Sequence, residues 1–297
     1  MRAIDMERDT IREVFRDVYG YGRLYGQMKA DLKGRVAIIT GATGMIGGAA
    51  ASILAKSGAR IALWGRNDEA GARKTLEIEE SGGEARYYHV DIADSYAMEA
   101  AVEKVSGDFG SIDILFANAG GNWTNRKPAT EMDEELFDCN IDINLTGGTI
   151  ALTKFVLPYM INQSGGSIVF TTSVCGVTGL RNQCGFVASK FAISALTRSL
   201  ALEYGKYNIR VNAIAPGSLP NPDANLNFLW NSCSFNDYDK NFENPGAMVF
   251  DIAARRPAYP TDMAGLVLYF VSDDACYTTG QVVSVDGGWT AGLSGDY

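Results

Sequence analysis

Residues 36–47 read VAIITGATGMIG, an apolar run of strand length followed by a turn with three glycines and the start of a helical pattern. Gly41 permits a tight turn, Gly44 lets a pyrophosphate approach the backbone, and Gly47 lets the helix pack closely on the strand. The helix N-terminus would offer free N–H groups to phosphates. A tight turn without a ligand is the alternative, but the place of this turn in the first βαβ unit favours a dinucleotide site. The residues expected to hold the dinucleotide here are Thr40, Gly41, Thr43, Gly44, Met45, Ile46 and Gly47.

Six further apolar runs of strand length follow, with helical patterns between them, for example at 49–56, 70–80 and 192–204. Strands that are apolar throughout and joined by helices indicate a parallel sheet covered on both faces. We therefore predict an α/β fold, a single-domain Rossmann-type doubly wound seven-stranded parallel sheet with helices on both faces. The seven strand runs are 36–40, 60–64, 86–90, 112–117, 166–172, 209–215 and 281–285.

Two segments interrupt this alternation. Residues 1–32 are predicted to form an N-terminal helical extension, because apolar residues recur there at helical spacing. Whether that face packs on its own domain or on another subunit stays open. Residues 218–258 lack periodicity and are rich in asparagine and aromatic residues. Since a loop of that length in a compact domain is usually functional, we predict a substrate lid within a catalytic domain spanning 33–297.

The composition excludes several classes of protein. Lysine and arginine total 26 and aspartate and glutamate 35, giving a formal net charge of −9, so we expect no nucleic-acid partner. Five widely spaced cysteines without a CxxC pair predict neither a disulfide framework nor a metal site, and they favour the cytoplasm. The N-terminus is charged throughout, and the nearly uncharged stretch 36–55 contains a glycine turn. We therefore expect no signal peptide and no membrane span.

The residues after the second strand run bear on the choice of nucleotide. Gly65, Arg66 and Asn67 follow that run, and the first acidic residue is Asp68. An acidic residue at the strand end would bind the 2′-hydroxyl of NAD. The planar guanidinium of Arg66 suits a 2′-phosphate instead. We predict NADP as cofactor, with NAD as the alternative and Arg66 and Asn67 as contacts, while a solvated surface arginine is the other interpretation of Arg66.

Further motifs stand at the strand ends and on the helices in a characteristic order. They are HVDI at 89–92, NAGG at 118–121, DINLTG at 142–147, Ser173, FVASK at 186–190, PG at 216–217, and TGQ at 279–281 with DGG at 286–288. With these motifs, residues 33 to 290 resemble the short-chain dehydrogenase/reductase family.

The resemblance implies further contacts with a nicotinamide dinucleotide. Asp91 would touch the adenine edge with its side chain and Ile92 with its backbone. Asn118 would hold the central strand and line the cofactor cleft. The remaining cofactor positions that the resemblance implies are Ala119, Gly120, Lys190, Pro216 and Gly217.

The resemblance also implies a catalytic set. Asn144 would support a water in a proton relay, and Ser173 would hydrogen-bond the carbonyl oxygen of the substrate. Lys190 would grip the nicotinamide ribose and lower the pKa of a tyrosine four residues earlier, on the same helical face. That tyrosine would donate the proton while the nicotinamide delivers a hydride.

Position 186, where the family has this tyrosine, is phenylalanine. The spacing from Ser173 matches the family, so the alignment is not shifted. Phe186 keeps the ring but removes the hydroxyl, and the loss of one general acid costs roughly 10²–10⁴-fold in rate. Three explanations stay open: a change introduced to trap substrate, a natural residue beside another proton source, or a protein that binds cofactor without redox activity. Met45 is a second departure, since many members have glycine there.

The resulting functional prediction is an NAD(P)-dependent oxidoreductase that interconverts a secondary alcohol and a ketone. The alternative is a catalytically silent cofactor-binding or scaffold subunit. Amide and aromatic side chains in 218–258 suit a polyhydroxylated ligand or a stacked phenolic ring. The loop holding Trp123, Arg126 and Lys127 follows the fourth strand run and should face the cleft. Family members usually form dimers or tetramers through the helices that hold Asn144 and Lys190. The second of these helices carries an apolar surface that favours a homotetramer, formed by Phe191, Ile193, Leu196 and Leu200.

Overall fold

A computed structural model describes residues 30–217, 219, 252–254 and 258–292. The structural statements below concern these residues. Two sequence predictions fall almost entirely outside them, namely the helical extension at 1–32 and the lid at 218–258.

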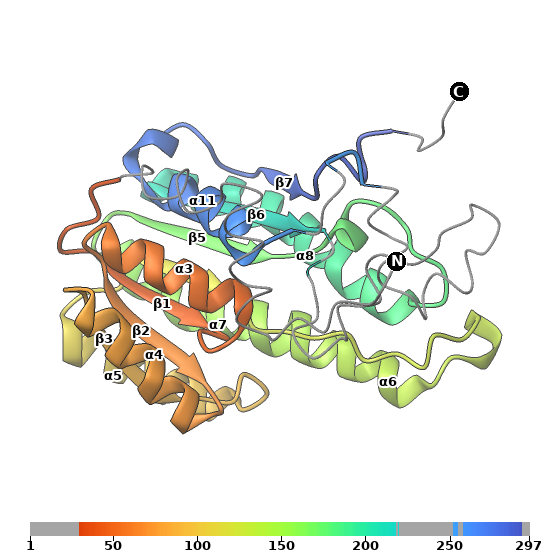
Figure 1. Ribbon diagram of the computed structural model, residues 1–297, viewed down its shortest axis with the longest axis horizontal. Coiled ribbons are helices and arrows are strands. Elements are labelled where there is room, and N and C mark those ends of the chain that lie inside the picture. Colours follow the sequence, from red (N-terminus) through yellow and green to blue (C-terminus); the bar gives the residue numbers. More distant parts are fainter. Residues whose placement is uncertain (1–29, 218, 220–251, 255–257, 293–297) are drawn as a thin grey trace, which may run out of the picture.

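The described chain contains one sheet of seven parallel strands in the order β3-β2-β1-β4-β5-β6-β7, which confirms the predicted fold class (Figure 1). Each predicted strand run forms a strand, with ends that differ by up to two residues. The strands are β1 (Val36–Thr40), β2 (Arg60–Gly65), β3 (Glu84–His89), β4 (Ile114–Ala117), β5 (Gly166–Thr171), β6 (Ile209–Pro216) and β7 (Val282–Val285).

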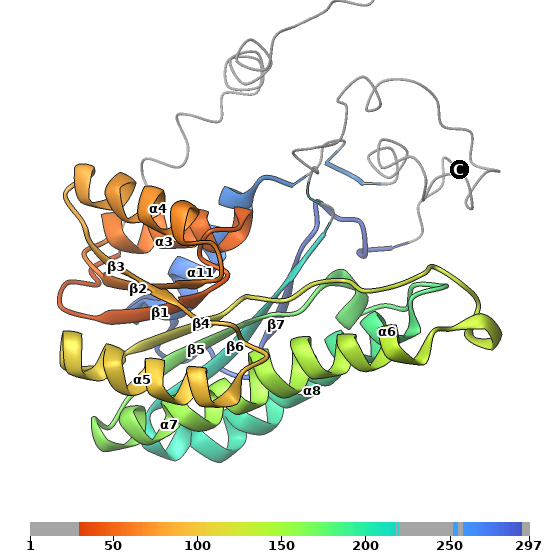
Figure 2. The ribbon, with the colours of Figure 1, turned by 90° about the horizontal axis from the view of Figure 1, so that it is seen from below.

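Helices cover both faces of the sheet. Figure 2 shows α3, α4 and α11 on one face and α5, α7 and α8 on the other. The α-helices of the described residues are α3 (Met45–Lys56), α4 (Asp68–Glu80), α5 (Ser95–Phe109), α6 (Glu134–Cys139), α7 (Leu152–Asn162), α8 (Cys184–Tyr204) and α11 (Pro260–Val271). The shorter helical segments are η1 (Ala129–Glu131), η2 (Asn140–Ala151), η3 (Val174–Gly176), η4 (Gly205–Tyr207) and η6 (Asp273–Ala275).

The core consists of two apolar clusters, one on each face of the sheet. All five residues of β1 are buried, and the side chains of the first four, 36–39, alternate between the clusters. The face of α3 toward the sheet carries small residues, such as Gly47 and Ala51, so that this helix can lie close to β1 and pack along α11. Asp94 caps the N-terminus of α5, and Gly110, with φ of 85°, ends it.

The strand order places a candidate cleft between β1 and β4. After β1 the chain builds β2 and β3 outward on one side, and β4 then returns to pair with the other side of β1. The loops after β1 and β4 therefore diverge, which leaves a crevice at the carboxyl ends of these strands. The glycine turn follows β1, and residues 118–121 follow β4.

Helix α6, η2 and α7 follow one another without a break over residues 134–162, so Asn144 lies on a long helix. The middle part, η2, has π-helical geometry, which is unusual over twelve residues. On the neighbouring α8, Ile193 is buried and Leu200 packs against the core, whereas 42% of Phe191 is exposed. Among the described side chains of α8, Phe191 and Leu202 are the large apolar ones that stay exposed.

Candidate active site

The turn after β1 is tightly built and leaves the N-terminus of α3 without a side-chain cap. Gly41 has φ of 64°, and a Cβ at position 47 would lie 2.3 Å from the Gly41 carbonyl oxygen. Only glycine fits at 47 without displacing the turn. Gly44 is the N-cap residue of α3, so no side chain caps this helix, and its first turn carries no acidic residue. The first N–H groups of α3 can therefore hold an anion.

Thr40 and Asn118 join the ends of the central strands. The Thr40 Oγ1 accepts hydrogen bonds from the backbone N–H groups of Asn118 (3.0 Å) and Ala119 (2.9 Å). The Asn118 Nδ2 donates to the Thr40 carbonyl at 3.1 Å, and the Thr171 hydroxyl donates to Asn118 Oδ1 at 3.1 Å. Thr40 is fully buried, so its hydroxyl holds the start of the loop after β4 from within the protein and does not face a ligand.

At the end of β2, the two predicted nucleotide contacts differ: the Arg66 side chain can turn toward a ligand, whereas the Asn67 side chain is already hydrogen-bonded. Arg66 is exposed, and its Nη1 lies 3.5 Å from Asp91 Oδ2. This ion pair is long and therefore weak, so a phosphate could replace Asp91 as the partner of Arg66. The Asn67 side chain instead caps α4 by accepting a bond from Ala70 N–H at 2.9 Å. Sequence reasoning missed the pairing of His89 Nδ1 with Asp68 Oδ1 at 2.6 Å. The hydrogen bond with His89 holds the pKa of Asp68 below its usual value.

Ile92, the other predicted adenine contact, is buried against η2. A Cβ at Gly147 would lie 2.3 Å from the Ile92 carbonyl oxygen, so glycine at 147 is what allows this close approach. At the end of β6, the Gly217 N–H donates to the Val285 carbonyl at 3.0 Å, which ties this predicted cofactor position to β7.

Asn144 is buried and braces the loop after β4. Its Oδ1 accepts a bond from Gly121 N–H at 2.9 Å, and its Nδ2 donates to the Gly121 carbonyl at 3.0 Å and to Ser189 Oγ at 3.2 Å. A Cβ at Gly120 would lie 2.6 Å from Asn144 Oδ1, so the loop lies directly on this amide. The structure therefore couples Asn144 to the residues that follow β4.

Lys190 and Phe186 lie one turn apart on α8 and face each other. The Lys190 Nζ is 5.8 Å from the centroid of the Phe186 ring and donates to the Thr171 carbonyl at 3.0 Å. Only 5% of Lys190 is exposed, and no carboxylate among the described residues forms an ion pair with it. Burial lowers the pKa of Lys190 to about 8. A buried cation without a counter-ion is a common mark of a binding or catalytic site.

Ser173 follows β5, at the same edge of the sheet as the end of β4. It is the N-cap residue of η3, and its Oγ accepts a bond from Cys175 N–H at 3.1 Å. Because the oxygen accepts that bond, the hydroxyl keeps its proton for another acceptor. Cys175 is buried, and burial raises the pKa of its thiol, so it is a poor nucleophile.

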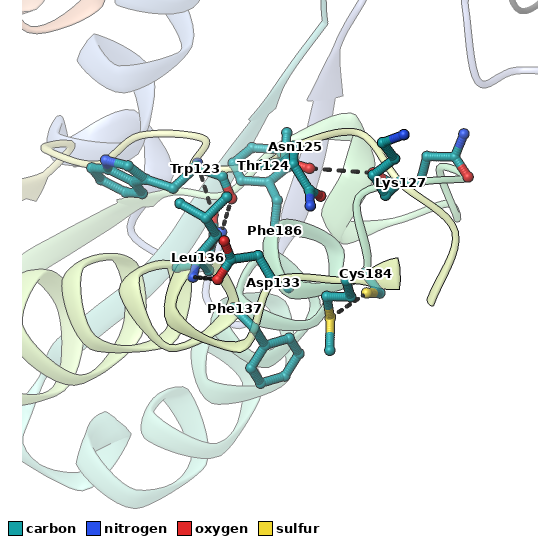
Figure 3. A pocket seen from close by; sticks show the side chains of 13 residues that line it. Trp123, Thr124, Asn125, Lys127, Asp133, Leu136, Phe137, Cys184 and Phe186 are labelled. Atoms are coloured by element: carbon teal, nitrogen blue, oxygen red, sulfur yellow. Dashed lines mark hydrogen bonds between the residues drawn. The ribbon is translucent and has the colours of Figure 1, made fainter. Parts of the chain in front are cut away.

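A shallow recess, partly open to solvent, lies beside Phe186 (Figure 3). Trp123 and Lys127 line it, as expected for the loop after β4, whereas Arg126 does not. Sequence reasoning missed Asn140, whose Oδ1 accepts a bond from the Trp123 N–H and whose Nδ2 donates to the Trp123 carbonyl, so that both amide atoms hold this loop. The residues lining the recess are Trp123, Thr124, Asn125, Lys127, Met132, Asp133, Leu136, Phe137, Asn140, Asn182, Cys184, Gly185 and Phe186.

Comparison with known proteins places this geometry in a family. Residues 41–290 match a family model described as enoyl-(acyl carrier protein) reductase. A 2,5-dichloro-2,5-cyclohexadiene-1,4-diol dehydrogenase of Sphingobium indicum is 34% identical over 262 residues, covering 88% of this chain and 99% of the relative. This chain belongs to the short-chain dehydrogenase/reductase family.

Solved structures of this family have the same fold. An NAD+-bound xylitol dehydrogenase is 36% identical with a TM-score of 0.78, and the match covers 86% of this chain and 99% of that one. A gluconate 5-dehydrogenase from Burkholderia cenocepacia, in complex with NADP and tartrate, is 27% identical with a TM-score of 0.77, covering 89% and 98%. The short-chain dehydrogenase/reductase relatives of this chain are thus oxidoreductases. In the part of the chain that the structure describes, no helix is long and apolar enough to cross a membrane.

Proposed function

We propose that the chain is an NAD(P)-dependent oxidoreductase that interconverts a secondary alcohol and a ketone. The observation that carries this proposal is the buried Lys190 beside Phe186, which has no carboxylate partner among the described residues and lies at the same edge of the sheet as the uncapped glycine turn. The bound NADP and NAD in structures of relatives support it. The test is NADPH binding by the chain as it stands, together with ketone reduction by a form with tyrosine at 186.

The residues present fit a nicotinamide dinucleotide. The N–H groups at the start of α3 would hold the pyrophosphate, Asp91 and Ile92 would hold the adenine, and the buried ammonium of Lys190 would bind ribose hydroxyls. A bound nicotinamide supplies or accepts the hydride. The Ser173 hydroxyl would donate a hydrogen bond to the carbonyl oxygen of the substrate, and Asn144 would keep the loop after β4 in place.

Proton transfer is the step that Phe186 alters. A phenylalanine can position a substrate against its ring but has no proton to exchange, so the Phe186 form would bind cofactor and substrate and turn over slowly. This is the behaviour expected of an inactivated Tyr-to-Phe form. Two alternatives make different predictions: another proton source would give ordinary turnover with Phe186, and a silent cofactor-binding subunit would give none with either residue.

We predict that NADPH binds more tightly than NADH by about 1.5–3 kcal/mol, the range for a hydrogen bond to a charged group. Arg66 is 73% exposed on its side chain and can turn from Asp91 to a 2′-phosphate. Arg66→Ala should therefore remove most of the difference, as measured by calorimetric titration with both nucleotides. Arg73→Ala is the matched control, because Arg73 is an exposed arginine paired with Glu69 on α4. Equal affinities in the parent protein would contradict the role given to Arg66.

We also propose a cytoplasmic homotetramer. In this family the helices holding Asn144 and Lys190 usually form subunit contacts, and here Ile150 and Phe191 on these helices expose 45% and 42% of their surface. Leu202, further along α8, is 87% exposed. Light scattering at micromolar concentration should give the mass of four chains, and Phe191→Asp should lower it. The mass of a single chain in the parent protein would refute the tetramer.

A further inference from the structure

Gln183 is a buried amide at the start of α8. It is the N-cap residue of this helix, yet its side chain makes no capping bond. Only 4% of Gln183 is exposed, and its Oε1 accepts a hydrogen bond from Asn122 Nδ2 at 2.5 Å. No described residue accepts a hydrogen bond from Gln183 Nε2. A buried donor without a partner is unfavourable, so a ligand that accepts from this nitrogen would be stabilised.

The unpaired nitrogen of Gln183 is not sealed inside the protein. In the described part of the chain, the side-chain atoms that are fully enclosed without a partner belong to Arg60 and Trp64. Gln183 Nε2 is not one of them, so a ligand can approach it. The bonded neighbour, Asn122, is exposed, and nothing in the described ranges donates to its Oδ1. Two adjacent side chains therefore offer one donor and one acceptor to a ligand.

This amide pair lies on the same side of α8 as Phe186 and Lys190. Gln183 precedes Phe186 by three residues and Lys190 follows it by four, so the three positions form one stripe along the helix. The loop after β4 follows this stripe. A Cβ at Gly120 would lie 3.6 Å from the Lys190 Nζ, and Asn122, two residues later, bonds to Gln183. Position 186 thus lies between the buried ammonium and the amide pair.

We infer that Gln183 and Asn122 bind a neutral hydroxyl of the substrate close to the reacting carbon, which makes hydroxy ketones and diols the preferred class. A hydroxyl can accept from Gln183 Nε2 and donate to Asn122 Oδ1, whereas a carboxylate has no proton for the Asn122 oxygen. One turn of α8, about 5 Å along its axis, separates Gln183 from Phe186. That spacing suits oxygens on neighbouring or next-but-one carbons. The inference rests on the proposed function for the reacting carbon.

Two ketones that differ by one hydroxyl test the inference at equilibrium. Calorimetric titration of the parent protein, saturated with oxidised NADP, would compare cyclohexanone with 2-hydroxycyclohexanone. Oxidised NADP has no hydride to transfer, so the ketone group stays intact. We expect the hydroxy ketone to bind at least about tenfold more tightly, which corresponds to about 1.4 kcal/mol. Equal binding, or tighter binding of cyclohexanone, would overturn the inference.

Two substitutions at Gln183 separate a bond to the ligand from support of the loop after β4. Gln183→Met removes the amide and should reduce the hydroxyl preference to less than about twofold, with NADPH affinity unchanged. Gln183→Glu, at about pH 8.5 and far above the ordinary pKa of a glutamate, keeps an oxygen for Asn122 Nδ2 but has no N–H to donate. It should lose the preference as well. A preference that survives in the glutamate variant would show that Gln183 only supports the loop, which contradicts the inference.

A third variant changes an exposed residue, so that its folding is not at risk. Asn122→Ala removes the acceptor and should lower the hydroxyl preference by about threefold or more. The matched control is Gln281→Met. Gln281 is an exposed glutamine before β7, its Nε2 donates to the Thr279 carbonyl at 3.3 Å, and its loss should leave the full preference. If Asn122→Ala and Gln183→Met both keep the preference, the hydroxyl binds elsewhere and the inference is refuted.

Turnover separates this inference from the proposed function. In the Phe186→Tyr form, a higher kcat/KM for 2-hydroxycyclohexanone than for cyclohexanone, lost on adding Gln183→Met, would support both. Equal kcat/KM values for the two ketones would keep the proposed function and overturn the hydroxyl preference. If the hydroxyl preference in binding depends on Gln183 and neither form reduces a ketone, the hydroxyl site stands and the proposed oxidoreductase activity fails.

Discussion

Replacing Phe186 by tyrosine is expected to raise the turnover of a ketone by about 10²–10⁴-fold, the contribution of one general acid. The ring of Phe186 already faces the Lys190 Nζ at 5.8 Å, so tyrosine adds one oxygen without demanding a new backbone position. The ammonium of Lys190 favours the phenolate and so lowers the pKa of the new phenol toward neutrality. Cofactor affinity should hardly change. Steady-state kinetics with NADPH, combined with calorimetric titration, measures both quantities.

A second substitution shows whether the increase in turnover comes from proton donation by the new phenol. Lys190→Met in the tyrosine form should abolish the increase, because the phenol loses its neighbouring cation. If the Phe186 form already turns over at the roughly 1–10³ s⁻¹ usual for enzymes, another proton donor exists and the role given to position 186 is wrong. If both forms bind NADPH and neither reduces cyclic or linear ketones, the silent-subunit alternative is favoured.

The fold was predictable because the central strands are apolar throughout. Strand β1 is buried at every position, and a run such as VAIIT is consistent only with a strand covered on both faces. The edge strand β3 was harder to delimit. It begins at Glu84, before the predicted start, because the backbone there pairs with Arg60 of β2 while the side chain is exposed. Backbone pairing of an exposed residue does not change the hydrophobic periodicity of the sequence, so it cannot be predicted from that pattern.

Helix α8 shows a similar limit of pattern reasoning. It begins at Cys184, eight residues before the apolar periodicity of 192–204 suggests. Its first turns bury polar residues, among them Ser189 and Lys190, and these are held by hydrogen bonds to Phe186 and Thr171 carbonyls. Apolar spacing cannot reveal a helix face that is buried through polar contacts.

Motif order predicts the residues of the candidate site, but not the residues that support them. The resemblance indicated Asn144, Phe186 and Lys190, which the fold places around the loop after β4. Nothing in the sequence indicated that Asn140 would hold Trp123, because an asparagine that bonds to backbone groups carries no pattern of its own. The pair of Asp68 with His89 also depends on the β2–β3 register, in which Gly65 lies opposite His89.

The second large effect is expected from a substitution in the glycine turn after β1, which should weaken NADPH binding. Gly47→Ala would place a Cβ 2.3 Å from the Gly41 carbonyl oxygen and 2.9 Å from Asn118 Nδ2. Backbone on one side and a hydrogen-bonded amide on the other leave no flexible atom to move aside, so the turn itself must shift. Overpacking of this kind costs about 1–3 kcal/mol. Since the displaced turn is the proposed pyrophosphate site, we expect NADPH affinity to fall by roughly 10–100-fold, as that cost implies.

The neighbouring glycine provides the matched control for this prediction. A Cβ at Gly48 would meet the flexible Lys74 Cε at 3.2 Å and the Ala42 carbonyl at 3.3 Å, so small shifts can accommodate an alanine there. Gly48→Ala should therefore keep NADPH affinity close to that of the parent, and alanine's higher helix propensity should offset part of any strain. Calorimetric titration gives both affinities, and urea unfolding shows whether each variant is folded. If Gly47→Ala folds and binds NADPH as tightly as Gly48→Ala does, the nucleotide is not held by the turn after β1, and the cofactor assignment built on Gly41, Gly44 and Gly47 is wrong.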